Sequence, residues 1–414
     1  MKKVALLFSL VALVASACAP TTLPTPTPTQ DMRPTVTPMS AGQGTSGATP
    51  AGPLPTEPVD LFPLPTLSNQ SPVMTPVAAA NESPLPTPSG EARTLIVLTH
   101  ESFALSDKVM QQFEQANNVK VQLIKQGDAG QALTRAILTK DNPEADVIFG
   151  VDNTFMSRAL DANILDTYQS AGLAAIAQEF QLDPTQHLIP IDYGDVCLNY
   201  DKAYFAQKKL QPPQTLADLT KPEYKNLLVV ENPADSSPGL AFMLATVSAL
   251  GENQWLSFWT DLKKNGVKVV EDWNTAYYTE FSGSSGKGSR PIVVSYASSP
   301  PAEVVFANPP IDQAPTAAIT TPKTCFRQIE FAGILKGTKN RDLAEKWIDF
   351  MLSVPYQEDL PLNQFVYPVN PQAKLPEAFT KWSSVAQEPA NLAPDVIAKN
   401  RDQWIEKWTN EVLR

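Results

Sequence analysis

Residues 190–202 read Pro-Ile-Asp-Tyr-Gly-Asp-Val-Cys-Leu-Asn-Tyr-Asp-Lys, near the middle of the part of the chain that has the composition of a folded protein. The stretch begins and ends as an apolar, strand-like run, and two carboxylates and a tyrosine surround Gly194 at its centre. A glycine with polar neighbours inside a strand indicates a bend or the close approach of a ligand. We therefore predict that residues 190–202 are the crossover between two lobes, with a binding cleft beside them.

Strand-like and helix-like segments alternate on both sides of this stretch. Short apolar runs typical of parallel strands are found at 94–98, 119–124, 145–150, 226–231, 267–270 and 292–296. Helices are predicted at 107–117 (after the N-cap Ser106), 130–139, from 154, and at 240–250, 342–352 and 394–412. This alternation predicts an α/β domain over residues 93–414 with a mostly parallel sheet, and a return between the lobes near residues 320–335.

The composition limits the class of partner. The chain has 414 residues and a net charge of −11, which argues against nucleic acid or an anionic membrane surface as the partner and suits a cationic or neutral ligand. We expect a monomer.

The amino terminus has the pattern of an export signal. Lys2 and Lys3 precede an apolar run too short to span a bilayer, and small residues follow it up to Ala17. We predict a signal peptide over residues 1–17. Cys18 follows the small residues as in a bacterial lipobox, and we expect it to be lipidated, which anchors the protein to the outer face of the cell membrane; the alternative is an ordinary signal cleaved at Ala17.

The following segment is rich in proline and threonine. Seventeen of the 39 prolines lie between Pro20 and Pro88, with few charged or aromatic residues. Such a segment buries too little apolar surface to offset its ordering entropy. We therefore predict a disordered, extended linker over residues 18–92 that carries the folded part as a stalk.

Two further cysteines, Cys197 and Cys325, lie in the crossover stretch and at the start of another strand-like run. An exported protein can form a disulfide. The sequence leaves two alternatives open, a disulfide between paired strands or two buried thiols that pack as small apolar groups.

Ligands of α/β sheets bind beyond the carboxyl ends of the strands. Those ends carry the turn 100–102, the segment 150–153 and the run 192–195, and residues 236–239 before an apolar helix form either a seat for an anion or polar group or a plain helix cap. Aromatic residues and carboxylates gather at these positions: Trp273, Tyr277, Tyr296, Phe365 and Tyr367, with Asp152, Asp192, Asp195 and Asp272. Aromatic faces beside carboxylates favour a flat or cationic ligand.

Catalytic motifs are poorly represented. The chain has two histidines, too few for a histidine-rich metal site and little material for a catalytic triad, and the glycine-rich run 283–288 lacks the spacing of a phosphate-binding loop. We therefore expect a binding protein without catalytic residues, metal or cofactor.

Several motifs, in this order, resemble those of the thiamine-binding solute-binding proteins of ABC importers. They are Ala145 to Asn153, Asp192-Tyr193-Gly194, Ser237-Pro238-Gly239-Leu240, Trp273-Asn274-Thr275-Ala276-Tyr277, Ser295 to Pro300 and Tyr367-Pro368-Val369. The resemblance implies a two-lobed type II periplasmic-binding-protein fold that closes over thiamine or its phosphates and delivers it to a membrane permease.

The resemblance also implies a set of pocket residues: His100, Glu101, Ser102, Asp152, Asp192, Ser237, Pro238, Gly239, Trp273, Tyr277, Tyr296 and Phe365. In this interpretation the aromatic rings stack on the ligand, and Asp152 with nearby acids balances its positive charge. Ser237 takes the hydroxyethyl or phosphate end. His100 and Phe365 stand where the family often has tyrosine and tryptophan.

Two other functions are compatible with the same fold. A ferric-iron site could use Tyr277 and Tyr278 with His100 and Glu101, because Fe(III) favours phenolate and carboxylate oxygens. A thiaminase-like enzyme could use Cys197 as its nucleophile with Asp195 or Asp272.

Overall fold

The computed structural model describes residues 92–285 and 288–414. The predicted signal peptide, Cys18 and the predicted linker up to residue 91 lie outside the described residues.

In this part of the chain, eleven strands form one mixed sheet in the order β2-β1-β3-β10-β5-β8-β6-β7, with β4, β9 and β11 at its margins. The strands are β1 (Arg93–Thr99), β2 (Val119–Lys125), β3 (Val147–Asp152), β4 (Leu165–Asp166), β5 (Ile189–Asp201), β6 (Leu228–Glu231), β7 (Lys268–Val270), β8 (Ile292–Tyr296), β9 (Thr316–Ile319), β10 (Phe326–Leu335) and β11 (Tyr367–Pro368). The predicted α/β class is confirmed.

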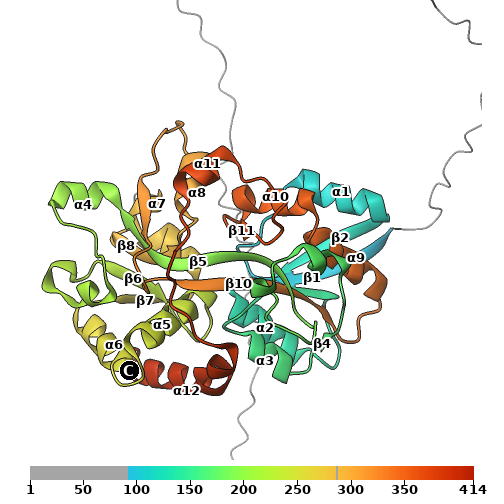
Figure 1. The fold of residues 1–414 in the computed structure, drawn as a ribbon, viewed down its shortest axis with the longest axis horizontal. Helices are drawn as coiled ribbons and strands as arrows, with labels where there is room; N and C mark the ends of the chain where they lie inside the picture. The colour runs from blue at the N-terminus through green and yellow to red at the C-terminus, as the bar shows by residue number, and fades with distance from the viewer. Residues whose placement is uncertain (1–91, 286–287) are drawn as a thin grey trace, which may run out of the picture. The chain divides into compact units, whose positions relative to one another are not determined.

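In the view of Figure 1, helices lie above and below this sheet. They are α1 (Asp107–Asn117), α2 (Ala129–Leu138), α3 (Met156–Asp161), α4 (Lys202–Lys208), α5 (Ser237–Leu250), α6 (Trp255–Lys264), α7 (Ser282–Ser285), α8 (Pro300–Val305), α9 (Arg341–Met351), α10 (Val354–Asn363), α11 (Glu377–Trp382) and α12 (Pro394–Val412). Short turns are η1 (Ala171–Ala175), η2 (Gln178–Phe180), η3 (Leu216–Thr220), η4 (Pro222–Tyr224) and the π-helical η5 (Thr275–Glu280). The predicted cap is present, since the Ser106 side chain accepts the N–H of Val109.

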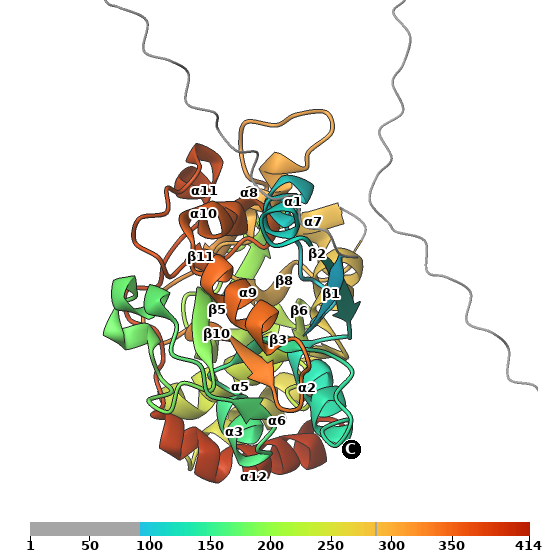
Figure 2. The same ribbon diagram turned by 90° about the vertical axis from the view of Figure 1, so that its right-hand side faces the viewer.

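Two long antiparallel strands, β5 and β10, join the two halves of the sheet (Figure 1). On one side β10 pairs with β3, which continues into the parallel strands β1 and β2; we call this half the first lobe. On the other side β5 pairs with β8, which continues into β6 and β7, the second lobe. The C-terminal helix α12 packs on α3 of the first lobe and α6 of the second (Figure 2).

The predicted break at Gly194 is wrong. Strand β5 runs without interruption through Gly194, and its pairing with β10 shifts instead at Ile191, which has no partner between Pro190 and Asp192. The glycine has another role, because a Cβ there would lie 2.8 Å from Cδ1 of Tyr296. Gly194 therefore makes room for an aromatic ring rather than for a bend.

Helix α5 is the central helix of the core. Its residues from Ser237 to Val247 are all buried, and it packs on β5, β6, β8 and β10. A helix that is apolar on every side is typical of a fully buried position. It begins three residues earlier than predicted, so Ser237, Pro238 and Gly239 form its first turn.

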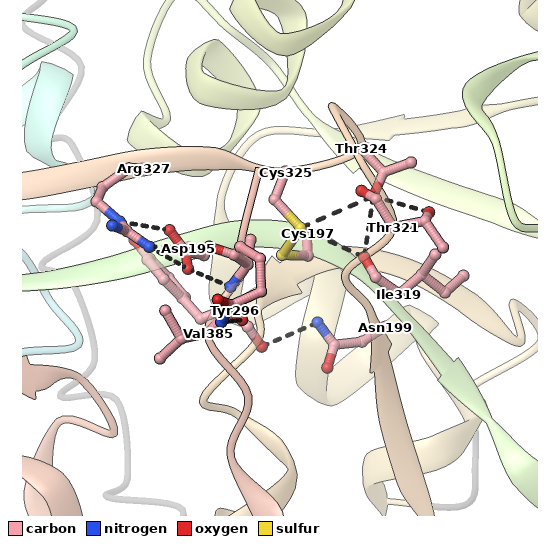
Figure 3. The surroundings of a disulfide bond; sticks show 12 residues. Asp195, Cys197, Asn199, Tyr296, Ile319, Thr321, Thr324, Cys325, Arg327 and Val385 are labelled. Carbon is pink, nitrogen blue, oxygen red and sulfur yellow. Dashed lines mark hydrogen bonds and ion pairs between the residues drawn. A yellow bond between two sulfur atoms is a disulfide. The ribbon is translucent and has the colours of Figure 1, made fainter. Parts of the chain in front are cut away.

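Cys197 and Cys325 form a disulfide between β5 and the residue before β10, with their Cα atoms 4.3 Å apart (Figure 3). Of the two alternatives left open by the sequence, the structure has the disulfide. Beside it, both carboxylate oxygens of Asp195 accept hydrogen bonds of 2.9 Å from the Arg327 guanidinium, and one also accepts the N–H of Ala386 at 2.7 Å. The two joining strands are therefore cross-linked covalently and by an ion pair.

Replacing both cysteines by alanine should lower the free energy of unfolding by about 2–5 kcal/mol, because the bond closes a long loop and restricts the unfolded chain. Urea unfolding of the wild type and of the double variant, each with and without reductant, measures this. Reductant should lower the urea midpoint of the wild type and leave that of the double variant unchanged. Equal midpoints for the two proteins would contradict a stabilising disulfide.

Candidate functional site

A cavity lies between the two lobes beside β10 and the start of α5. Eight of the twelve residues predicted from the sequence line it: His100, Ser102, Ser237, Pro238, Trp273, Tyr277, Tyr296 and Phe365. The others in its lining are Asp128, Ala129, Tyr278, Ser299, Ala302, Glu330, Gln364 and Val366. Serine, proline and aromatic positions far apart in sequence thus meet at one place.

His100 enters the cavity directly after β1, above a glycine of β3. Gly150 has a φ of +97°, and a Cβ there would lie 2.5 Å from Cδ2 of the His100 ring. Burial lowers the pKa of His100 to about 4, with the positive charge of Lys125 as a second cause. The imidazole is therefore neutral at pH 7, with its Nε2 atom 3.7 Å from Oε1 of Glu330.

Trp273 and Tyr277 form a stacked aromatic pair from the turn around η5. Their ring centroids are 4.9 Å apart at an interplanar angle of 16°. The Trp273 indole N–H donates to the Ser295 hydroxyl at 3.0 Å, which fixes the ring against β8. π-helical turns such as η5 occur frequently at functional sites. Tyr277 is 1% exposed, so a flat ligand would meet this pair at the half-buried ring of Trp273.

Tyr296 lies at the end of β8 over Gly194. Its hydroxyl donates to Oε1 of Gln328 at 3.1 Å. Phe365 comes from the other lobe, after α10, in the left-handed region (φ +56°), and its ring meets that of Phe306 edge to face at 5.6 Å. Aromatic side chains of both lobes therefore meet at the cavity.

Asp152 does not line the cavity and is not free to balance a ligand's charge. It is fully buried, and one of its oxygens accepts from the backbone N–H and the hydroxyl of Thr154 at 2.6 and 2.5 Å. The other accepts from the Ser237 hydroxyl and, at 3.4 Å, from the Gln328 amide. Asp152 thus ties β3 to the start of α5 and to β10, which corrects the role expected from the sequence.

Three other predicted residues also lie outside the lining. Glu101 is exposed, Asp192 is buried behind Glu330, and Gly239 packs on the carbonyl group of Glu231, 2.6 Å from where a Cβ would be. The aromatic residue Tyr367 stacks on Tyr193 instead, with ring centroids 5.3 Å apart.

The sequence reasoning missed two carboxylates of the lining, Asp128 and Glu330. Burial raises the pKa of each to about 7. Asp128 follows β2 and could have been found by the strand-end rule that identified the turn at 100–102. Glu330 gives no such signal, because it lies inside the apolar run of β10, where its backbone pairs in register with Asp152 on one side and Asp192 on the other.

The cavity lining is acidic. Asp128 and Glu330 are the ionisable acids of the lining, and the described residues that line it include no lysine or arginine. Because a buried carboxylate is stabilised by a nearby positive charge, such a site favours a cationic ligand. The Asp128 carboxylate also accepts the backbone N–H of Trp273 at 3.2 Å, a hydrogen bond that joins the two lobes.

The structure bears differently on the two alternative functions. Cys197 is fully buried and bonded to Cys325, so it has no thiol available as a nucleophile. The hypothesis of a thiaminase-like enzyme that uses Cys197 is therefore wrong. For iron, His100, Tyr277 and Tyr278 line the cavity, whereas the fourth residue named for it, Glu101, is exposed and lies outside the lining.

This fold and cavity define a solute-binding protein, and the chain belongs to the family of bacterial extracellular solute-binding proteins, whose model matches residues 142–385, more than half of the chain. Its two-lobed architecture is that of the type II periplasmic binding proteins. Among the described residues, no helix has the length and apolar character needed to cross a membrane.

Several known proteins are similar to this chain over most of its length. The thiamine-binding periplasmic protein of Escherichia coli is 28% identical over 77% of this chain and 94% of the relative, and that of Brucella suis is 28% identical over 78% and 93%. A solved periplasmic thiamin binding protein superposes with a TM-score of 0.69 at 26% identity, covering 80% of this chain and 99% of that one. A ferric binding protein from Campylobacter jejuni has a TM-score of 0.62 at 16% identity and shares the fold.

The structure predicts that Asp152 is needed for stability. Asp152→Ala should lower the free energy of unfolding by about 2–3 kcal/mol, because the buried donors of Thr154, Ser237 and Gln328 lose their acceptor. Urea unfolding measures the change, with Asp141→Ala in the exposed turn after α2 as the control. If the Asp152→Ala variant is as stable as the wild type but no longer binds ligand, the structural role of Asp152 is contradicted. Asp152 would then balance the charge of the ligand.

Proposed function

We propose that this protein captures thiamine or its phosphate esters outside the cytoplasm and delivers it to the permease of an ABC transporter. The observation that carries the proposal is the cavity between the lobes, where the stacked pair Trp273 and Tyr277 faces a space that also holds Asp128 and Glu330. Thiamine combines two flat rings with a permanent positive charge. The names of the relatives and their coverage of nearly the whole folded part support this choice.

The aromatic residues and the carboxylates of the site have complementary roles in this proposal. The half-buried rings of Trp273 and Tyr296 hold the ligand by stacking and cation–π attraction, and the buried Tyr277 supports Trp273 from behind. Asp128 and Glu330 supply the negative charge. Because these residues come from both lobes, ligand binding favours the closed arrangement, which a permease can distinguish from the open one.

The proposal includes an anchor. Residues 1–17 would direct export, a lipid on Cys18 would hold the protein at the outer face of the membrane, and the linker 18–92 would let the folded part reach the permease. Binding without chemistry is proposed, so thiamine should be recovered unchanged after prolonged incubation with the protein.

Replacing Trp273 or Tyr277 by alanine should weaken thiamine binding by roughly tenfold or more, about the value of one lost stacking contact. Isothermal titration calorimetry of each variant with thiamine measures this, with Fe(III) as a competing ligand for the wild type. Trp382→Ala, which removes an indole outside the cavity lining, is the matched control and should bind like the wild type. Unchanged affinity in both cavity variants would refute the site.

Thiamine affinity should fall as the pH is lowered. Burial raises the pKa of Asp128 and Glu330 to about 7, so acid protonates them and removes the charge that attracts the cation. Linkage for one such group gives an affinity about tenfold weaker at pH 6 than at pH 8. Titrations at the two pH values test this, and Asp128→Asn should flatten the dependence; tighter binding at pH 6 would be inconsistent with it.

A further inference from the structure

We propose that Asp192 is a positioning residue of the site: as a neutral carboxylic acid it donates a hydrogen bond to Glu330 and holds the Glu330 carboxylate toward the cavity. The sequence suggested that Asp192 contacts the ligand, but the residue is fully buried and lies outside the lining. It acts on the ligand only through Glu330, which does line the cavity. This inference rests on the proposed function, because thiamine affinity is one of its measurements.

The Asp192 carboxyl group has no donor directed to it in the part of the chain that the structure describes. The residue is 0% exposed, and neither of its carboxyl oxygens has a hydrogen-bond partner there. Asp152, which is equally buried, accepts hydrogen bonds from Thr154 and Ser237. A carboxylate that is buried without donors is costly to ionise and keeps its proton instead. Asp192 is thus a neutral acid, and its proton makes it a donor.

The acceptor for this proton is Glu330. The two residues stand opposite each other in the antiparallel pairing of β5 and β10, so their side chains leave the sheet on the same face. Without a proton, neither carboxyl group can donate to the other, whereas one shared proton makes a donor and an acceptor of the pair.

The proton of this pair belongs to Asp192 and the negative charge to Glu330. Burial and then the charge of Glu330 raise the pKa of Asp192 well above its usual range. Burial also raises the pKa of Glu330, to about 7, but the hydrogen bond from Asp192 opposes this rise. Glu330 is therefore the member of the pair that ionises near neutral pH.

The other groups that face the pair do not replace this donor. They are Asp152 on β3, His100 after β1, Asp128 before α2, Tyr296 at the end of β8 and Tyr356 on α10. The neutral imidazole of His100 places Nε2 3.7 Å from Oε1 of Glu330, too far for a hydrogen bond. The hydroxyl of Tyr296 donates to Gln328, and that of Tyr356 is directed to Gln364.

The hydrogen bond from Asp192 has two effects on a cationic ligand. It favours the ionised form of Glu330, because a hydrogen bond to a charged acceptor is stronger than one to a neutral acceptor. It also fixes the direction of the Glu330 carboxylate. An asparagine at position 192 can donate from its amide in the same way, whereas an alanine cannot.

Calorimetric titration of the full chain with thiamine between pH 6 and pH 9 tests this in Asp192→Ala and Asp192→Asn. In Asp192→Ala, the pH below which affinity falls should move up by about one unit or more, because a hydrogen bond to a charged group contributes about that much. Thiamine should then bind about fivefold or more weakly at pH 7. Asp192→Asn should keep the wild-type affinity and pH dependence.

Two further variants show whether Asp192 acts through Glu330. Adding Asp192→Ala to Glu330→Gln should cause no loss of affinity beyond that of Glu330→Gln alone. Glu231→Gln is the matched control, because Glu231 is another buried acid without a hydrogen-bond partner among the described residues and lies outside the lining. This control should change neither the affinity nor its pH dependence.

Infrared difference spectroscopy of the ligand-free protein is a second measurement, which needs no ligand. Protonated and ionised carboxyl groups absorb at different frequencies. At pH 9 the wild type should show the band of a protonated carboxyl group that is missing from Asp192→Asn. Identical spectra of the two proteins in this region would overturn the neutral state of Asp192.

The outcomes separate this inference from the proposed function. Absence of thiamine binding by the wild type refutes the proposed function, and the infrared spectra still decide the state of Asp192. An unchanged pH dependence in Asp192→Ala, folded as judged by near-ultraviolet circular dichroism, overturns the positioning role and leaves thiamine capture intact. If Asp192→Ala does not fold, Asp192→Asn decides: a loss of affinity as large as that of Glu330→Gln shows that Asp192 itself carries the charge and overturns the proposal.

Discussion

The burial of carboxylates at the centre of the sheet is the constraint on which the site depends. Asp152, Glu330 and Asp192 are neighbours in register across β3, β10 and β5. Asp152 is compensated by hydrogen bonds, whereas burial and then the charge of Glu330 raise the pKa of Asp192 well above its ordinary value. Glu330 reaches the cavity beside the neutral imidazole of His100, and the described residues of the lining offer it no lysine or arginine. Such a group is expensive to ionise in the free protein, and a cationic ligand lowers that cost.

The rest of the structure positions aromatic rings around this charge. Gly150 and Gly194 lack the side chains that would displace His100 and Tyr296. Trp273 is held by a hydrogen bond to Ser295 and by its backbone contact with Asp128 in the other lobe. Because β5 and β10 pass through both lobes and are cross-linked at Cys197 and Cys325, the joining strands form a rigid base for lobes that meet over the ligand.

Much of the fold could be predicted from local sequence patterns. The apolar runs predicted the strands, and Ser106 predicted the start of a helix. These features depend on residues that are neighbours in the sequence. The predictions that failed concern residues whose roles depend on contacts with residues distant in sequence. Asp152 was assigned to the ligand because it ends a strand, but hydrogen bonds from Ser237 and Gln328 already satisfy it. Glu330 was missed because only the register between β10 and its neighbours turns it toward the cavity. The pairing of Cys197 with Cys325 likewise needed the strand register.

Buried carboxylates of the cavity should give up protons when a cationic ligand binds beside them. Calorimetry of thiamine binding at pH 7, in buffers of different ionisation enthalpy, counts the protons exchanged. We expect a net release of protons to the buffer that is smaller in Asp128→Asn. Binding with no proton exchange, or with a net uptake, would show that these carboxylates are not the countercharge of the ligand.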